Sequence, residues 1–145
     1  MGKSQTTAKN KYNAKSYDRI SVIVKKGVKD EWKSEAEKLG LSLNAFIERA
    51  VNQMIKQEKV IKMVLEIPLD ELDLSVRTYN CLYKAKIDTI GSFKQFIETN
   101  EINKIVNFNK MTAFYFFNKL KECENKYNVS LHIDYNNLLS QLPNE

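Results

Sequence analysis

The chain has 145 residues, of which 28% are charged, and a formal net charge of +5. This length allows one ordinary domain or two very small ones, and the composition changes along the sequence favour two. There is no run of about 18 apolar residues to span a membrane and no apolar signal-peptide core at the N-terminus. With two cysteines, one histidine and no CxxC pair, a zinc site and a disulfide framework are excluded. We expect a reduced, cytoplasmic protein without a metal or cofactor.

Positive charge is concentrated near the N-terminus. Residues 1–60 carry 13 Lys/Arg against 7 Asp/Glu, a net of +6, whereas residues 61–145 carry 10 against 11, a net of −1. Because Lys and Arg neutralise phosphates, this asymmetry predicts a double-stranded DNA partner for the N-terminal part. The alternative is that part of the basicity carries no function, since the chain is rich in Lys, Asn and Ile, which an AT-rich coding sequence favours.

The first 25 residues predict an arm and a strand. Residues 1–17 contain four lysines and no acid, a composition typical of a flexible basic arm. Residues 18–25 are rich in β-branched side chains that alternate between two faces, as in a short β-strand. One face carries Ile20, Val22 and Val24, and the other carries Arg19, Ser21 and Ile23.

Two amphipathic helices are predicted next. One covers residues 28–39 and ends at Gly40, and the other runs from Ser42, a good N-cap, to about residue 58. One strand and two short helices bury too little surface to make a closed core, and the strand has no partner within the segment. Pairing with a second copy of the protein solves both problems.

This pattern of strand, Gly-punctuated turn and helix is followed by Gly40, Ser42, Asn44, Phe46 and Ile47 in the spacing G-x-S-x-N-x-F-I. Residues 17–58 thereby resemble the ribbon-helix-helix family of Arc/MetJ-like repressors. The resemblance implies a homodimer whose two strands form an antiparallel ribbon that enters the DNA major groove.

In the register that the resemblance implies, Arg19, Ser21 and Ile23 face the bases. Arg19 can bind a guanine edge, Ser21 can serve several bases, and Ile23 can contact a thymine methyl. The start of the second helix and one lysine are expected to bind DNA phosphates. These residues are Ser42, Leu43, Asn44 and Lys25. The alternative is that the strand residues are merely exposed on a strand without contacting DNA and that Ser42 only caps a helix.

Beyond a linker at residues 59–66, the sequence predicts short helices at about residues 75–84, 91–97, 101–105 and 111–127. A tail follows, with apolar residues able to pack back on a domain. We therefore predict a mainly α protein with one short N-terminal β-strand, in which a ribbon-helix-helix module precedes a small all-α, helix-hairpin-helix-like domain.

The second half contains LDLSVRTYNCL at Leu72–Leu82, followed by IDTIG at Ile87–Gly91. Residues 67–132 resemble the C-terminal domain of the bacterial RNA polymerase α subunit. The resemblance implies that Arg77 enters the minor groove with Asn80 and Cys81 beside it. Narrow, A/T-rich minor grooves are strongly negative and attract an inserted guanidinium. The alternative for Arg77 is a surface salt bridge.

The resemblance also implies two further contact regions. A second hairpin would bind phosphates through Asn109, Lys110 and Thr112, although the family's usual Gly-Lys-Lys-Ser-like turn is replaced here by Asn109-Lys110-Met111-Thr112. Three acids lie where the family contacts a sigma factor or regulators of RNA polymerase, namely Asp70, Glu71 and Asp73. A solvated edge that favours acids at a helix start is an equally good explanation for these acids.

These features together predict a dimeric, DNA-binding transcriptional regulator associated with the nucleoid. The alternative is an antitoxin- or partition-type protein whose second domain binds a protein partner such as a toxin, RNA polymerase or a sigma factor. We do not expect an enzyme, because the sequence offers no paired carboxylates, no nucleophile with a base and no metal cluster.

Overall fold

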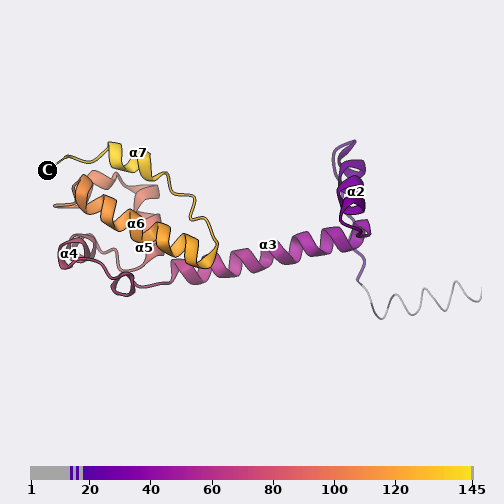
Figure 1. Ribbon diagram of the computed structural model, residues 1–145, viewed down its shortest axis with the longest axis horizontal. Helices are drawn as coiled ribbons and strands as arrows, with labels where there is room; N and C mark the ends of the chain where they lie inside the picture. The colour runs from indigo at the N-terminus through magenta and orange to yellow at the C-terminus, as the bar shows by residue number, and fades with distance from the viewer. Residues whose placement is uncertain (1–13, 15, 17, 145) are drawn as a thin grey trace, which may run out of the picture. The chain divides into compact units, whose positions relative to one another are not determined.

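The computed structural model describes residues 14, 16 and 18–144. The protein divides into two compact units, residues 1–48 and 49–145, and its helices are shown in Figure 1. The predicted basic arm at residues 1–17 lies outside the described residues except for two positions. Every helix within residues 18–144 is too short or too polar to cross a lipid bilayer.

The N-terminal unit contains helix α2, Val28–Lys38, and the beginning of α3, Leu43–Leu65. Gly40 ends the first helix in the left-handed conformation, with φ of 67°. The N–H groups of Gly40 and Leu41 donate to the carbonyls of Glu37 and Ala36, which is the Schellman arrangement that glycine favours. The two helices predicted for this unit are therefore confirmed.

The strand predicted for residues 18–25 is not formed, and no β-strand occurs within residues 18–144. The physical reason is that a strand needs a second strand to pair its backbone groups, and residues 18–144 of a single copy offer none to this segment. Ile20 and Ile23 are 84% and 98% exposed. The prediction of a mainly α protein is correct, whereas the predicted strand and ribbon are not formed in the described part of the single copy.

Helix α3 is longer than predicted and includes the residues expected to form a linker at 59–66, except for the last. Its C-terminal turns belong to the second unit, where Val64 is fully buried and Val60 and Leu65 pack against the same core. Most residues from 59 to 65 are good helix formers, and burial of this apolar stripe stabilises the helix further. Tertiary packing, which no local signal indicates, therefore extends the helix.

The C-terminal unit consists of short helices around one apolar core. In chain order these are η1 Leu69–Leu72, α4 Val76–Lys84, α5 Ile90–Thr99, η2 Ile102–Lys104, α6 Lys110–Tyr127 and α7 Tyr135–Ser140. The ring of Phe93 meets Phe116 edge-on at 4.8 Å between centroids, a favourable aromatic geometry. The predicted helices at 75–84, 91–97, 101–105 and 111–127 are confirmed with small shifts of their ends.

The tail after residue 128 is part of this core. Leu131, Leu138 and Leu142 are buried in the same cluster as the aromatic rings. Glu124 fastens the tail to α6, because its carboxylate accepts hydrogen bonds from the Leu131 N–H at 2.6 Å and from the Tyr135 hydroxyl at 3.0 Å. The packing therefore shows no boundary at residue 132, where we expected the domain to end.

Candidate nucleic-acid interface

One face of α4 carries two of the side chains that the sequence singled out, together with a lysine that it did not. The helix begins after Ser75, whose hydroxyl accepts a hydrogen bond from the Thr78 N–H at 3.1 Å, as an N-cap does. Residues three, four and seven positions apart share a helix face. Arg77, Asn80 and Lys84 are therefore presented together, and all three are exposed.

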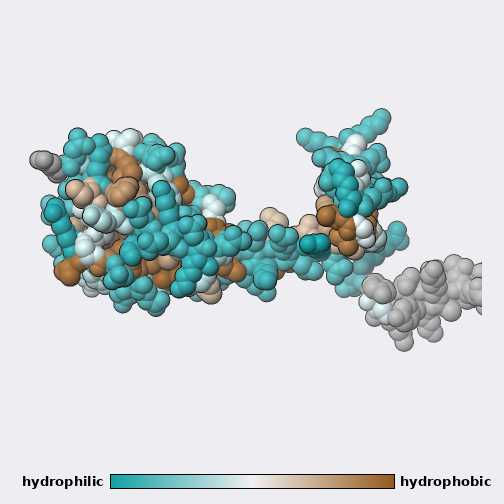
Figure 2. All heavy atoms as spheres, in the orientation of Figure 1, coloured by the Kyte–Doolittle hydropathy of each residue, from teal (hydrophilic) through white to brown (hydrophobic). Residues whose placement is uncertain are grey.

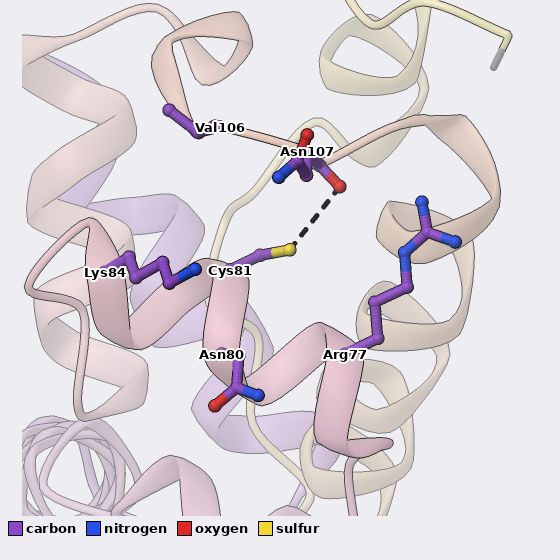
Figure 3. A pocket seen from close by; sticks show the side chains of 6 residues that line it. All are labelled: Arg77, Asn80, Cys81, Lys84, Val106 and Asn107. Atoms are coloured by element: carbon purple, nitrogen blue, oxygen red, sulfur yellow. Dashed lines mark hydrogen bonds between the residues drawn. The ribbon is translucent and has the colours of Figure 1, made fainter.

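These residues line an open pocket of about 340 Å³, with Cys81, Val106 and Asn107 as its other lining residues. Figure 3 shows Arg77 and Lys84 at opposite ends of the pocket, with Cys81 and Asn107 between them. Two cations thus flank a stretch of amide groups that can both donate and accept hydrogen bonds. Such a surface suits a linear polyanion better than a compact apolar ligand.

Cys81 holds the two walls of the pocket together. Its side chain is buried, and its Sγ lies 3.4 Å from the backbone carbonyl oxygen of Asn107, to which the thiol donates. Asn107 is in the left-handed conformation, with φ of 61°, which asparagine tolerates better than most residues. The thiol therefore positions the loop, and the place beside Arg77 in the minor groove that the resemblance implies for Cys81 stays a prediction.

The Arg77 guanidinium has no protein partner among the described residues. No salt bridge or hydrogen bond joins it to another side chain within residues 18–144. The alternative role of Arg77 in a surface salt bridge is therefore not seen in this part of the protein. A charged group held at a pocket without a counter-ion is available for an external anion.

The second predicted phosphate-binding turn has a different arrangement. Asn109 caps α6, and its Oδ1 accepts hydrogen bonds from both the N–H and the hydroxyl of Thr112, each at 2.9 Å. Thr112 is buried, and its hydroxyl is already bonded to the Asn109 side chain. Lys110 donates its N–H to the Pro143 carbonyl at 3.0 Å and its Nζ to Asn144 Oδ1 at 2.8 Å. Lys110 is thus the charged group of this turn, and it is held by the C-terminal segment.

The predicted acidic surface lies on η1 and the residue after it. Asp70, Glu71 and Asp73 are all exposed. The Asp73 carboxylate lies 3.9 Å from the Lys119 Nζ on α6, in a solvent-exposed ion pair. Exposed pairs of this kind contribute little to stability, so the structure leaves these carboxylates accessible to a partner.

The residues predicted to bind DNA in the N-terminal unit are also accessible. Arg19, Ser21, Ile23 and Lys25 are exposed on the segment that precedes α2. Ser42 caps α3, since its hydroxyl accepts a hydrogen bond from the Ala45 N–H at 3.2 Å. Asn44 is exposed and Leu43 is half-buried. The capping role of Ser42 is confirmed, and phosphate binding at this turn stays a prediction.

Sequence reasoning missed Lys84, Val106 and Asn107. Lys84 had a usable signal, because it follows Arg77 by seven residues and so shares its helix face. Asn107 had none, since its carbonyl meets a thiol 26 residues earlier in the sequence. Val106 is an exposed apolar residue of the same loop, and beside the apolar Ile105 it gave no sign in the sequence of a surface role.

Comparison with known proteins covers this same region. Residues 55–122 match the family model of the C-terminal domain of the bacterial RNA polymerase alpha subunit. We call residues 55–122 the αCTD-like region. It contains the whole pocket, the Asn109–Thr112 turn and the three acids, so the predicted resemblance of the second half is confirmed over most of its length. The ribbon-helix-helix resemblance of residues 17–58 receives no support from the comparisons.

Curated relatives are similar to part of this chain, and the similarity covers only part of each relative. A DNA-directed RNA polymerase subunit alpha from Desulforudis audaxviator is 35% identical over 89 residues, which are 61% of this chain and 28% of the relative. The same subunit from Carboxydothermus hydrogenoformans is 38% identical over 65 residues, which are 45% of this chain and 20% of the relative. The chain therefore spans less than a third of the length of these relatives. No solved structure matches it.

Proposed function

We propose that the protein is a DNA-binding regulator of bacterial transcription whose αCTD-like region binds DNA through the pocket on α4. The observation that carries the proposal is the pair of cations, Arg77 and Lys84, at the two ends of a polar pocket within that region. Their side chains can neutralise backbone phosphates, which provides the sequence-independent part of DNA affinity.

Each residue of the pocket has a distinct role in this proposal. Arg77 enters a narrow A/T-rich minor groove, where the negative potential attracts a guanidinium. Lys84 binds a phosphate as a point charge, and the Asn80 and Asn107 amides bind sugar or base edges. Cys81 is a positioning residue that keeps the Asn107 loop against α4.

The N-terminal unit contributes dimerisation and a second DNA contact. Among its described residues only Ala36 is buried, so the described part of this unit has no core of its own. Figure 2 shows hydrophobic side chains on its surface where α2 meets the start of α3. A second copy would cover this surface and pair with residues 18–25 in an antiparallel ribbon. Arg19, Ser21 and Ile23 would then face the major groove, as in ribbon-helix-helix proteins.

Replacement of Arg77 tests the DNA contact. We expect Arg77→Ala to weaken binding to an A/T-rich duplex by about tenfold or more, because one charge-assisted contact is lost. The slope of log K against log salt should also become shallower by about one. Fluorescence anisotropy of a labelled duplex at several salt concentrations measures both quantities.

Arg49→Ala is the matched control, since Arg49 is an exposed arginine of α3 to which we assign no contact. Affinity that is equal for the wild type, Arg77→Ala and Arg49→Ala would contradict a DNA contact at the pocket. If Arg77→Ala then lost a protein partner instead, such as RNA polymerase, a sigma factor or a toxin, the antitoxin- or partition-type function would be supported. In either function the exposed acids Asp70, Glu71 and Asp73 are the proposed surface for a sigma factor or polymerase.

A further inference from the structure

The C-terminal segment returns to the first turn of α6, as Figure 1 shows. The Lys110 N–H donates to the Pro143 carbonyl at 3.0 Å, and the Lys110 Nζ donates to Asn144 Oδ1 at 2.8 Å. Both polar groups of one residue are therefore bonded to two adjacent residues of the segment. Lys110 and Asn144 are 34 residues apart in sequence, so the contact is tertiary.

The preceding residue anchors this contact. Leu142 is buried in the core of the unit, together with Leu138 of α7. The burial of Leu142 places the carbonyl of the next residue, Pro143, at the start of α6. Asn144, by contrast, is exposed, and its bond to Lys110 is open to solvent. The segment is thus fixed up to Leu142, and the next two residues form a short extension that can be displaced without unfolding the core.

The donors taken by this extension are those that a phosphate would use. The first N–H groups of a helix have no partner within the helix and attract anions. In α6 the Thr112 N–H is already bonded to the Asn109 side chain, and the Lys110 N–H is bonded to Pro143. Lys110 supplies the charge of this turn, and its ammonium is directed to Asn144.

We propose that Pro143 and Asn144 compete with a DNA phosphate for the N–H and ammonium groups of Lys110, and so hold the second DNA contact in an inhibited state. This inference rests on the proposed DNA-binding function. Both acceptors in the tail are neutral, whereas phosphate is an anion. The hydrogen bond from the Lys110 N–H becomes charge-assisted, and about twice as strong, when phosphate replaces the Pro143 carbonyl. The Lys110 ammonium gains an ion pair in place of its bond to the Asn144 amide. DNA therefore displaces the extension, and the affinity for DNA is lowered by the free energy of the two hydrogen bonds between Lys110 and the extension that must break.

Removing the Asn144 side chain tests this competition. We expect Asn144→Ala in the protein of residues 1–145 to bind a short A/T-rich duplex about two- to fivefold more tightly. The gain is small because a solvent-exposed hydrogen bond is weak. The slope of log K against log salt should stay as in the wild type, because DNA displaces the extension in both proteins and the same phosphate contact forms. The matched control is Asn136→Ala, the same change at an exposed position of α7 in the same segment, which should bind as the wild type does.

Lys110→Ala completes a double-mutant cycle. If the tail acts through Lys110, the gain from Asn144→Ala disappears in the Lys110→Ala background. In the free Asn144→Ala protein, amide hydrogen exchange at Lys110 should also be faster than in the wild type, which reports release of the extension without DNA. Unchanged affinity and unchanged exchange in Asn144→Ala would overturn the proposal, as would a gain that persists without Lys110.

The Arg77→Ala variant separates this proposal from the one on which it rests. If Arg77→Ala weakens binding and Asn144→Ala does not strengthen it, the pocket binds DNA and the tail does not compete. If neither Arg77→Ala nor Lys110→Ala weakens binding, the αCTD-like region does not bind this duplex and both proposals are wrong.

Discussion

At the scale of single residues, Cys81 illustrates how one buried group shapes a binding surface from inside. Its thiol reaches the Asn107 carbonyl across the pocket. A methyl group in its place would fill part of the space but could not donate. In the sequence, the absence of a histidine or second cysteine near Cys81 indicated that it is neither a nucleophile nor a metal ligand. In the structure, Cys81 positions the Asn107 loop.

Tyr135 couples the tail to pH. Burial raises the pKa of its phenol above the ordinary value of 10.0, and the nearby Glu124 carboxylate raises it further. In the unfolded protein the phenol therefore loses its proton near pH 10, whereas the folded protein keeps it. Unfolding above that pH releases a proton, so the stability that the phenol contributes is complete below about pH 10 and falls as the pH rises further.

Tyr135→Phe should separate the two contributions of this residue. Near neutral pH we expect a loss of about 1 kcal/mol, since one hydrogen bond to Glu124 disappears. From about pH 10 upward the variant should lose stability less steeply than the wild type, because it has no phenol to titrate. Urea unfolding midpoints at a series of pH values measure both effects. Parallel curves for the two proteins above about pH 10 would show that the phenol does not titrate on unfolding.

At the scale of elements, Gly91 controls how closely α5 approaches the end of α3. A Cβ atom at Gly91 would lie 2.8 Å from the Leu65 carbonyl oxygen. In a helix alanine is favoured over glycine by about 1 kcal/mol, but overpacking costs about 1–3 kcal/mol. The backbone carbonyl cannot move aside as a flexible side group would, so we expect the steric cost to prevail.

Gly91→Ala should therefore lower the free energy of unfolding by about 1–2 kcal/mol, measured by chemical denaturation. Ser92 is unsuitable as a control because it closes the capping box with Thr89. Gln95→Ala, at an exposed position of the same helix, tests the helix without the close approach. A Gly91→Ala variant as stable as the wild type would mean that α5 shifts away from Leu65 at no cost.

The elements also show what the sequence can and cannot predict. The start of α3 was predictable because a capping residue, Ser42, precedes an apolar repeat. Ser75 and Asn109 cap α4 and α6 in the same way, although the sequence had indicated Asn109 only as a phosphate contact. The end of α3 was not predictable, because the burial of Val64 in a distant core decides it. Likewise Arg77 was recoverable from a motif, whereas the bond from Lys110 to the C-terminal segment joins stretches whose local patterns give no sign of a contact.

At the scale of the whole molecule, the proposed dimer gives two neighbouring residues, Val22 and Ile23, different roles. Val22 is 59% exposed and Ile23 is 98% exposed in the single copy, so neither supports the fold of the monomer. In an antiparallel ribbon, successive side chains point to opposite faces. Val22 would lie in the dimer core and Ile23 would face the DNA.

We therefore expect Val22→Asp to weaken dimerisation by at least about tenfold, because a carboxylate would be buried without a partner. Ile23→Asp should leave the dimer intact and weaken DNA binding instead. Sedimentation equilibrium over a range of concentrations measures the first effect, and anisotropy of a labelled duplex the second. Equal dimerisation of both variants, or a wild type that stays monomeric at high concentration, would contradict the ribbon.

Because α3 ends inside the C-terminal core, the choice of fragment boundaries and fusion points in this protein is restricted. A fragment that begins at residue 67 would lack both Val64, which is buried in that core, and the Leu65 carbonyl against which Gly91 packs. Val60 also packs against this core, so we expect a fragment that folds independently to start upstream of it. A graft of this unit onto another protein would have to carry those helical turns with it, joined in helical phase.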